Sequence, residues 1–319
     1  MLVAEWMDDA GLEALGAASR VTCRPELAEN RSALLALLPE ADALVVRNRV
    51  RVDAQLLAAG RDRLRAVGRL GSGIDNIDVH ACRAAGVHVV QASGANAQAV
   101  CEYVFAGLLH LLRRLHAADA AVRAGSWPRG DFLGGELSGR TLGLIGLGAV
   151  GARVATCARA LGMPVLGHDP LVLPGTPACE ASGAEWCPFG DVLVRSDIVS
   201  LHLPLSRETH HLLGAAQLRR MRRGAILVNT ARGGLVDEAA LCAALAEGRL
   251  GGAVIDVRER EPPGAEDPLA KVHSVLLTPH VAGWTQEAQR RVGLAVAHGV
   301  LSALEVPARV GGLTAAGDG

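Results

Sequence analysis

The chain has 319 residues; half of them are hydrophobic, a fifth are charged, and the formal net charge is −1. This composition can fill hydrophobic cores and excludes an intrinsically disordered protein. The near-zero charge excludes a general electrostatic attraction to nucleic acid or to anionic membranes. At this length we expect two domains of roughly 100–200 residues each.

Short apolar runs alternate along the chain with segments of helical periodicity. The runs are almost continuously apolar, which is typical of strands covered on both faces. Between them apolar residues recur at i, i+3, i+4 and i+7, and the longest such stretch predicts one helix from Gln98 to Arg123. The alternation predicts an α/β fold with parallel sheets and right-handed crossovers. In chain order the predicted strands are 2–6, 43–48, 66–69, 87–91, 141–148, 164–169, 198–204, 225–230, 252–257 and 274–280.

Three features of the sequence bear on where the protein works. No apolar run reaches the roughly 18–20 residues of a membrane span, and the N-terminus lacks the basic and apolar regions of a signal peptide. The seven cysteines are scattered and include no C-x-x-C pair, which argues against a disulfide framework or a zinc ribbon. We therefore expect a cytoplasmic protein with reduced thiols and with no metal, nucleic-acid or membrane partner.

The glycine-rich segment 146–151 follows an apolar strand and opens a helical segment. In such a strand–turn–helix unit, Gly146 allows the tight turn, Gly148 lets the backbone approach a pyrophosphate, and Gly151 lets helix and strand pack closely. The pyrophosphate then binds the free N–H groups at the helix N-terminus. The pattern predicts a dinucleotide-binding turn; the alternative is a glycine-rich turn in a plain α/β unit.

An acidic residue stands where a dinucleotide-binding unit needs one. Asp169 ends the next predicted strand, 18 residues after Gly151. A carboxylate there accepts both ribose hydroxyls of NAD and repels the extra phosphate of NADP. The next residues, 170–172, include no Arg, so the sequence favours NAD. The alternative is an Asp that only begins the turn before Pro170.

Three later residues have the side chains of a catalytic set. Arg232, Glu261 and His280 each lie at or just beyond the end of a predicted parallel strand, where open α/β sheets bind ligands. A planar guanidinium holds a carboxylate by two parallel hydrogen bonds. A His exchanges a proton near neutral pH, and a carboxylate beside it orients the ring. Each alone also fits a surface Arg, a capping Glu or a structural loop His; together they predict acid–base chemistry on a carboxylate-bearing substrate.

At this point the sequence resembles the D-2-hydroxyacid dehydrogenase family, and within it the phosphoglycerate-dehydrogenase-like branch. The resemblance covers nearly the whole chain. The segments 5–15, 45–52 and 68–78 also resemble the sulfolactate dehydrogenases of this family. The motifs that carry the family resemblance are GRLGSGIDNID (68–78), GANAQAVCE (94–102), GELSGRTLGLIGLGAVG (135–151), SLHLPLSRETHHLL (200–213), LVNTARGGLVDE (227–238), DVREREPP (256–263) and LTPHVAGWTQEA (277–288).

The resemblance implies an α/β protein of two Rossmann-like, doubly wound parallel-sheet domains with a catalytic cleft between them. The substrate domain would comprise residues 1–96 plus 286–319, and the NAD-binding domain residues 97–285. The nucleotide domain usually carries the dimer contact in this family, so a homodimer is expected. Because the chain stops at Gly319, we expect no C-terminal regulatory domain of the kind some phosphoglycerate dehydrogenases have.

The resemblance also implies roles for individual residues. Arg232 would bind the substrate carboxylate and polarise the keto oxygen, His280 would pass the proton, and Glu261 would pair with it. The backbone around Leu70, Gly71 and Ser72 would hold the other side of the carboxylate. His202 and Pro204 would lie near the adenosine, and Thr230, Ala231 and Asp256 near the nicotinamide. The full set of expected cofactor-binding residues is Gly146, Gly148, Ala149, Val150, Gly151, Asp169, His202, Pro204, Thr230, Ala231, Asp256 and Gly283.

Two departures from the family pattern stand out. The common aromatic residue after Asp256 and Val257 is Arg258 here, which we interpret as surface variation. The usual Asn-Ser-x-Ser segment is 96–99 with Ala in place of both Ser residues, and we expect the loss of two hydroxyls to affect cofactor or hinge contacts.

The sequence thus predicts an NAD-dependent oxidoreductase that interconverts a small 2-hydroxy acid and its 2-keto acid. Formate-type oxidation is disfavoured, because that branch pairs its His with Gln rather than with a residue such as Glu261. A different class, an NAD(H)-sensing corepressor-like binding protein of the same fold, stays open as the alternative.

Additional cations suggest a second anionic group on the substrate. Arg47, Arg49 and Arg69 follow predicted strands, and Arg forms paired, charge-assisted bonds with sulfonate or phosphate. We expect a dianionic acid such as sulfolactate or 3-phosphoglycerate, with Arg69 as the first candidate to bind it. The alternative is that these Arg side chains are solvated or paired with acids such as Asp75, Asp8 and Asp9, although the last two can instead cap the first helix.

Overall fold

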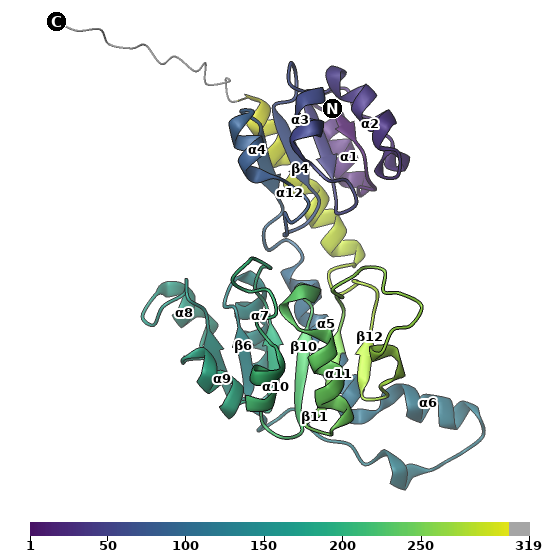
Figure 1. Ribbon diagram of the computed structural model, residues 1–319, viewed down its shortest axis with the longest axis vertical. Helices are drawn as coiled ribbons and strands as arrows, with labels where there is room; N and C mark the ends of the chain where they lie inside the picture. Colours follow the sequence, from purple (N-terminus) through teal and green to yellow (C-terminus); the bar gives the residue numbers. More distant parts are fainter. Residues whose placement is uncertain (306–319) are drawn as a thin grey trace, which may run out of the picture. The chain divides into compact units, whose positions relative to one another are not determined.

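The structure is a computed structural model that describes residues 1–305. The chain divides into two compact units (Figure 1). Unit 1 comprises residues 1–96 and the chain from Gln286 onward, and unit 2 comprises residues 97–285. The last part of the expected first domain, residues 306–319, lies outside the described residues.

Unit 1 contains a five-stranded sheet in which all neighbouring strands are parallel, in the order β2-β1-β3-β4-β5. The order reverses direction between β1 and β3, the switch point at which such sheets open a crevice for ligands. One face is covered by α1 and α12, whose residues share a core with the central strands, and the other by α2, α3 and α4. Asp8 caps α1 by accepting a hydrogen bond from the Ala10 amide, which confirms the capping alternative for this residue. The elements are β1 (Leu2–Val3), α1 (Asp9–Gly16), β2 (Thr22–Cys23), η1 (Pro25–Ala28), α2 (Arg31–Leu37), η2 (Leu38–Glu40), β3 (Ala43–Val46), α3 (Ala54–Ala59), β4 (Ala66–Arg69), α4 (Val79–Ala84), β5 (His88–Gln91) and α12 (Gln286–Glu305).

Unit 2 contains a seven-stranded parallel sheet in the order β12-β11-β10-β9-β6-β7-β8. The switch point lies between β6 and β9. Two buried clusters, one on each face, attach α5 and α7 to one side of the sheet and α9, α10 and α11 to the other. The elements are α5 (Ala97–Arg113), α6 (Leu115–Arg123), η3 (Arg129–Phe132), β6 (Leu142–Ile145), α7 (Ala149–Ala160), β7 (Val165–His168), α8 (Pro177–Ser182), β8 (Glu185–Trp186), α9 (Phe189–Arg195), β9 (Ile198–Leu201), α10 (Ala215–Arg220), β10 (Ala225–Asn229), η4 (Gly233–Leu235), α11 (Glu238–Ala246), β11 (Leu250–Ile255), η5 (Leu269–Lys271) and β12 (Val275–Leu277).

The two parallel sheets, covered by helices on both faces, confirm the predicted α/β class. Each of the ten strands expected from apolar runs is present, although most are shorter than the run that predicted them. The apolar residues beyond the strand end form turns instead; Leu147, for example, lies in the turn after β6 and is still buried. The two-residue strands β2 and β8 were not expected, because two residues show no period.

The prediction of one helix from Gln98 to Arg123 is wrong. Arg114 adopts a left-handed conformation (φ 50°) and separates α5 from α6. Its guanidinium donates to the Asp131 carbonyl at 2.6 Å and lies over the Phe132 ring at 5.1 Å, so contacts with a later segment stabilise the break. Unlike α5, α6 has no buried residue, and its apolar side chains remain on the surface.

Among residues 1–305, no helix combines the length and the apolarity that crossing a lipid bilayer requires. The same part of the chain contains no cluster of His, Cys, Asp and Glu side chains suited to a metal ion.

Candidate active site

The glycine-rich turn between β6 and α7 has the geometry its sequence predicts. Gly146 has a φ of 99°, and a Cβ there would lie 2.2 Å from the His202 carbonyl oxygen. A Cβ on Gly151 would lie 2.1 Å from the Gly146 carbonyl oxygen, so only glycine permits this approach of helix to strand. Gly148 is the N-cap of α7, forms no side-chain cap and faces open space. The turn is a cradle of backbone amides that a diphosphate fits and that a side chain at this position would fill.

Asp169 follows β7 and lies beside this cradle. Its Oδ2 accepts a hydrogen bond from the Leu147 amide and its Oδ1 one from the Leu171 amide, both at 2.8 Å. The second of these bonds forms the local turn that the alternative interpretation expected, and the first ties the carboxylate to the glycine-rich turn. Each oxygen retains a further lone pair, so the carboxylate is oriented without being saturated.

His280 and Glu261, separated by 19 residues in the sequence, form a direct pair. His280 Nδ1 lies 2.8 Å from Glu261 Oε2, and both side chains are about two-fifths exposed. His280 has a φ of 57°, and its amide donates to the Asp256 carbonyl at 2.8 Å. Because Nδ1 is bonded to Glu261, Nε2 is the ring nitrogen left for a substrate.

The charge state of Glu261 follows from its surroundings. Burial raises the pKa of this carboxyl, but hydrogen bonds from His280 and from the Arg258 amide, with the nearby His280 and Arg232 charges, outweigh burial. The net pKa lies below the ordinary value, so Glu261 is ionised at neutral pH and can stabilise a protonated His280.

A buried carboxylate holds the loop that carries His280. Asp256 is 1% exposed, and its oxygens accept hydrogen bonds from the Thr278 hydroxyl at 2.6 Å and from the Val281 and Ala282 amides at 2.8 Å. The Tyr103 hydroxyl bonds to Thr278 in turn. Burial, with a contribution from the Asp256 charge, raises the pKa of Tyr103 to about 12 despite that bond. Asp256 thus fixes the backbone on either side of His280.

Arg232 lies just after β10 and shares a pocket with the other two predicted catalytic residues. Its carbonyl accepts from the Asn229 side chain at 2.8 Å, and its guanidinium donates to the Ala231 carbonyl at 2.6 Å. The pocket has a volume of about 360 Å³. The structure therefore brings the predicted set together within unit 2. The residues that line this pocket are Leu205, His210, Arg232, Gly233, Gly234, Arg258, Glu259, Glu261 and His280.

The interpretation of Arg258 as surface variation is wrong. Its side chain is 9% exposed and forms ion pairs with Glu238 and Asp267 at 2.8 and 2.5 Å. Sequence reasoning missed this role because the two carboxylates lie 20 and 9 residues away, with no periodic pattern that links them to Arg258.

The remaining cofactor candidates follow β9 and β10. His202 Nε2 lies 2.9 Å from the Ser200 hydroxyl, and burial lowers the pKa of His202 to about 4, so the ring is neutral. The Thr230 hydroxyl is buried and has no hydrogen-bond partner among residues 1–305, which leaves a polar atom for a ligand to satisfy. The Ala231 amide donates to the Asn229 side chain at 3.1 Å. Pro204 is exposed, and Gly283 lies in the turn closed by the Trp284 amide and the Val281 carbonyl.

The expected substrate-binding residues of unit 1 follow β4. Leu70 is 1% exposed, and Gly71 has a φ of 151° and packs against the Arg69 guanidinium. The Ser72 hydroxyl is 3.2 Å from the Ala92 carbonyl and 3.1 Å from the Asn96 side-chain oxygen. The close packing of Arg69 on Gly71 fixes its guanidinium at the carboxyl edge of the unit 1 sheet.

The other two Arg residues of unit 1 differ from each other. Arg49 pairs with Glu29 at 2.8 Å, and both side chains are largely exposed, so it matches the solvated alternative. Arg47 lies over the Trp6 ring at 5.4 Å, and burial lowers its pKa to about 10 although Glu5 opposes that shift. Glu5 itself, which sequence reasoning did not single out, is 4% exposed and accepts from four consecutive amides, 47–50.

A dinucleotide cradle at a topological switch point and a His–Glu pair beside an Arg define the class of an α/β nucleotide-dependent oxidoreductase. Comparison with known proteins specifies the family. Residues 105–282 match the family model of the D-isomer specific 2-hydroxyacid dehydrogenase, NAD binding domain.

Curated relatives agree with this match. The chain is similar to the (S)-sulfolactate dehydrogenase of Chromohalobacter salexigens, with 44% identity over 97% of this chain and 99% of that protein. It is also similar to the D-3-phosphoglycerate dehydrogenase of Archaeoglobus fulgidus, with 41% identity over 86% of this chain but only 51% of that protein. The chain thus spans about half the length of this second relative.

A solved structure extends the likeness to three dimensions. The D-lactate dehydrogenase of Aquifex aeolicus, solved with NAD and lactic acid, superposes with a TM-score of 0.80 and 29% identity over 94% of each chain. The chain belongs to the D-isomer specific 2-hydroxyacid dehydrogenase family. It is an NAD-dependent oxidoreductase of 2-hydroxy acids, and none of these findings supports the corepressor-like alternative.

Proposed function

We propose that the chain reduces a dianionic 2-keto acid to its 2-hydroxy acid, and reverses this reaction, with Arg232, Glu261 and His280 as its catalytic residues. The observation that carries the proposal is the 2.8 Å pair of His280 Nδ1 and Glu261 Oε2 in the pocket that also contains Arg232. Proton transfer and carboxylate binding need these groups in one place.

Each side chain has one task in this mechanism. The Arg232 guanidinium binds the substrate carboxylate and draws electron density from the adjacent keto oxygen. The bound nicotinamide cofactor supplies a hydride for reduction and accepts one on oxidation. His280 gives a proton from Nε2 to the carbonyl oxygen during reduction and takes the hydroxyl proton back during oxidation. Glu261 holds Nδ1 and stabilises the charged ring.

The glycine-rich turn and Asp169 fit NAD. The free amides at the start of α7, which Ala149 and Val150 begin, would bind the diphosphate. The Asp169 carboxylate would accept the ribose hydroxyls, in addition to the two amides that orient it. The Thr230 hydroxyl, which has no hydrogen-bond partner among the described residues, would form a hydrogen bond to the nicotinamide end of the cofactor. Ala231, Asp256 and Gly283 would lie at the same end. His202 and Pro204 would face the adenosine.

Unit 1 would be the substrate domain and unit 2 the NAD-binding domain. The match of residues 105–282 to an NAD-binding domain supports the assignment of unit 2. In unit 1, the amides of Leu70, Gly71 and Ser72 would bind the carboxylate, and Arg69 would bind the second anionic group. The similarity to an (S)-sulfolactate dehydrogenase supports a sulfonate as that group.

A panel of 2-keto acids tests the substrate. NADH absorbance should report faster turnover of 3-sulfopyruvate or 3-phosphohydroxypyruvate than of pyruvate. Since a charge-assisted bond contributes about 1.5–3 kcal/mol, the preference in kcat/KM should be roughly 10–100-fold. Arg69→Ala should remove that preference, whereas Arg61→Ala, at an exposed Arg of the same unit, should not. Equal kcat/KM for all three acids, or an unchanged kcat/KM preference in Arg69→Ala, would contradict recognition of the substrate through a second negative charge.

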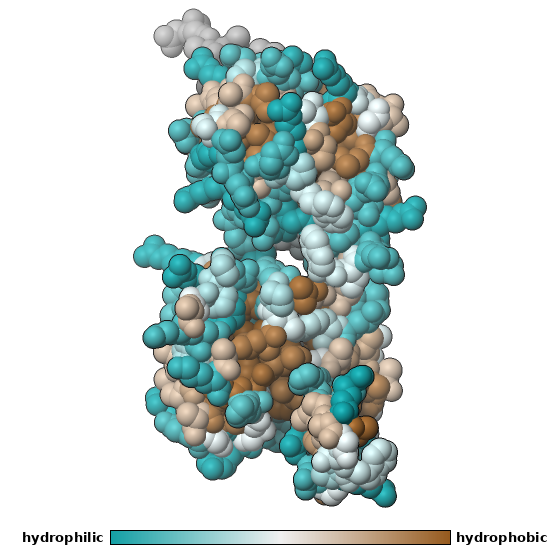
Figure 2. Space-filling model, turned by 90° about the vertical axis from the view of Figure 1, so that its right-hand side faces the viewer, coloured by the Kyte–Doolittle hydropathy of each residue, from teal (hydrophilic) through white to brown (hydrophobic). Residues whose placement is uncertain are grey.

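A homodimer formed through unit 2 is part of the proposal. Figure 2 shows a hydrophobic area on the face of unit 2 that carries β12 and α6. The large apolar side chains exposed between residues 109 and 133 are Leu109, Leu115, Val122, Trp127 and Leu133. An apolar surface of this kind marks an interaction site.

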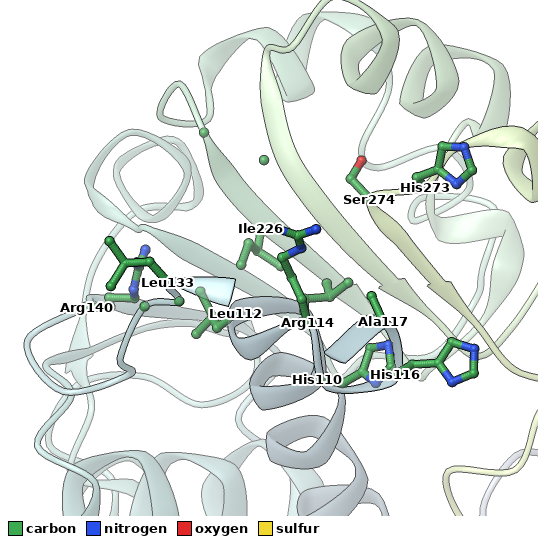
Figure 3. A pocket seen from close by; sticks show the side chains of 15 residues that line it. His110, Leu112, Arg114, His116, Ala117, Leu133, Arg140, Ile226, His273 and Ser274 are labelled. Atoms are coloured by element: carbon green, nitrogen blue, oxygen red, sulfur yellow. The ribbon is translucent and has the colours of Figure 1, made fainter. Parts of the chain in front are cut away.

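A pocket lies beside α6, which contributes His116 and Ala117 to its lining. Figure 3 shows Leu112, Arg114, Leu133, Ile226 and Ser274 in its lining. Ile226 lies near the start of β10 and Ser274 directly precedes β12, so the pocket lies at the amino ends of these strands, whereas His280 follows β12. An apolar residue of a second copy would fit such a pocket. Leu115→Glu should therefore convert a dimer into a monomer in light scattering; a wild-type chain that is already monomeric contradicts the proposal.

We further propose a cytoplasmic location. All seven cysteines are free thiols in the described part of the chain, as is usual in a reducing compartment. Fractionation of cells that produce the protein tests this assignment, and recovery outside the cytoplasm would contradict it.

A further inference from the structure

Arg258 builds a buried ion cluster with Glu238 and Asp267. Its Nε and Nη2 donate to the two oxygens of Glu238 at 2.9 and 2.8 Å, and its Nη1 and Nη2 donate to those of Asp267 at 2.5 and 2.7 Å. Both contacts are bidentate. The three side chains are between 9% and 20% exposed, so one guanidinium joins the start of α11 to the loop before η5.

Within the cluster, Arg258 and Asp267 stabilise each other's charged forms. The hydrogen bonds that Arg258 donates to Asp267 and Glu238 raise its pKa and outweigh the effect of burial. The bond from Arg258 is in turn the main cause that lowers the pKa of Asp267. A planar fork held on two sides has a fixed orientation, which a flexible ammonium would not have.

The backbone of Arg258 transmits this orientation to the catalytic residues. Its amide donates to Glu261 Oε1 at 3.0 Å, while Oε2 of the same carboxylate binds His280. On the other side, a Cβ on Gly233 would lie within 2.3 Å of the peptide that joins Arg258 to Glu259, so this peptide packs directly beside the residue that follows Arg232.

A second bond holds the same peptide in place. The Glu259 amide donates to Glu238 Oε1 at 2.8 Å, and the Glu259 carboxylate accepts from the Glu238 amide at 3.1 Å. Both ends of the peptide 258–259 are therefore tied to Glu238, by the Arg258 side chain and by this amide.

We propose that Arg258 is a positioning residue, which sets the Glu261 carboxylate against His280 and thereby tunes proton transfer. Its guanidinium touches neither the His280 ring nor Glu261; it acts through its own peptide. The proposal rests on the roles of Glu261 and His280 in the proposed function.

Arg258→Lys is the sharpest probe, because it keeps the positive charge between Glu238 and Asp267 and loses the fork. We expect kcat for reduction of the preferred 2-keto acid to fall roughly tenfold, a part of what acid–base catalysis contributes. KM and the NADH dissociation constant should stay within about twofold, since the guanidinium is 9% exposed and held by Glu238 and Asp267. The alkaline limb of the pH profile of kcat/KM should move to lower pH, because Glu261 would stabilise a protonated His280 less well.

A double-mutant cycle separates positioning from general damage. If Arg258 acts through Glu261, Arg258→Lys should change kcat by less than about twofold in a Glu261→Gln background. Arg222→Lys is the matched control: this Arg of the same unit is paired with Asp197 at 2.8 Å, and its replacement should leave kcat and the pH profile unchanged. Thermal unfolding of each variant verifies that it is folded.

Should Arg258→Lys not fold, the triple variant Arg258→Met, Glu238→Gln, Asp267→Asn removes the buried charges together, and the same loss of kcat is expected from it. An unchanged kcat and pH profile in a folded Arg258 variant, or an equal loss with and without Glu261, overturns the positioning role. The failure of the proposed function looks different: Glu261→Gln alone would then leave kcat intact, which overturns both proposals.

Discussion

Each of the two units has, at the carboxyl edge of its sheet, a turn in which backbone amides converge, and the two turns are occupied differently. After β3 of unit 1, the amides of 47–50 all donate to the buried Glu5 carboxylate, at 2.7–3.3 Å. After β6 of unit 2, α7 begins at Gly148 without a side-chain cap. The first turn is filled by an anion of the chain itself, and the second is open to one from outside.

The same α/β architecture can therefore have, at the carboxyl edge of its sheet, either an amide turn closed by its own carboxylate or an amide turn open to a ligand. A single Glu that follows β1 closes the amide turn of unit 1, because a carboxylate with several N–H donors satisfies all of them. A glycine in place of any side chain keeps the amides of unit 2 exposed. In both units the amides are supplied by the fold, and one side chain decides whether they bind the chain itself or a ligand.

The largest effect should come from removing the proton-transfer group that acts on the substrate once NADH is bound at the open turn of unit 2. His280→Ala should lower kcat by about 10²–10⁴-fold, the usual contribution of a general acid–base group. The NADH dissociation constant should change little, since the cradle of 146–151 is untouched. Stopped-flow absorbance and NADH fluorescence measure the two quantities. A variant that loses cofactor binding but keeps its turnover would place the acid–base chemistry elsewhere.

The filled turn can be broken by Glu5→Leu. Four amides would lose their charged acceptor, and we expect a loss of about 3 kcal/mol in the stability of unit 1. Hydrogen exchange at the amides 47–50 should accelerate most. Glu29→Leu is the control, because Glu29 is largely exposed and pairs with the exposed Arg49; its effect should stay within about 0.5 kcal/mol. Unchanged protection of 47–50 in Glu5→Leu would remove the basis of the comparison.

The open turn can be narrowed by Gly148→Ala. The backbone of Gly148 (φ −67°, ψ −165°) suits Ala, and the added Cβ meets no atom within 4 Å. Stability should therefore be preserved, while the methyl group should weaken NADH binding about tenfold where a diphosphate approaches. Gly16→Ala, also in open space, serves as the control. Tight NADH binding by Gly148→Ala would show that the diphosphate lies elsewhere.

The smallest effect at neutral pH concerns His202, whose carbonyl oxygen packs against Gly146 beneath the open turn. Its pKa is lowered from 6.5 to about 4, so between these values the unfolded chain binds more protons than the folded one. Stability should then fall as the pH drops from 6.5 toward 4, by at most about 1.4 kcal/mol per pH unit. Urea unfolding at several pH values should give a shallower slope for His202→Gln than for the wild type or for His80→Gln. Equal slopes would mean that the ring is charged in the folded state.

What the sequence could predict was set by how local each signal is. The motif 146–151 specifies its own turn, because the glycines that must approach other backbone atoms lie within one strand–turn–helix unit. All strands of the described residues except β2 and β8 were recognisable from apolar runs for the same reason. Arg232, Glu261 and His280 were recognised as strand-end residues, and the family resemblance implied that Glu261 pairs with His280; the folded geometry adds the 2.8 Å distance between Nδ1 and Oε2.

The unpredicted features depend on partners far along the chain. Glu5 accepts amides 42–45 residues away, and Arg258 binds carboxylates on two separate segments. No periodicity in the sequence marks such contacts. In the sequence, a buried Arg cannot be distinguished from a surface Arg until its partners are known. The break at Arg114 was hidden in the same way, since it depends on Asp131 and Phe132 beyond the predicted helix.

The bond from Tyr103 to Thr278 gives the loop that carries His280 an optical reporter of its own. Tyr103 is the chain's one tyrosine, and through Thr278 it is tied to the carboxylate that holds the backbone around His280. With its pKa raised to about 12, the phenol should stay protonated in alkaline buffer for as long as the loop is seated. If the loop separates from α5, Tyr103 should instead ionise near the ordinary tyrosine pKa of about 10. The ultraviolet absorbance of the phenolate would therefore report this separation in the unlabelled wild-type protein.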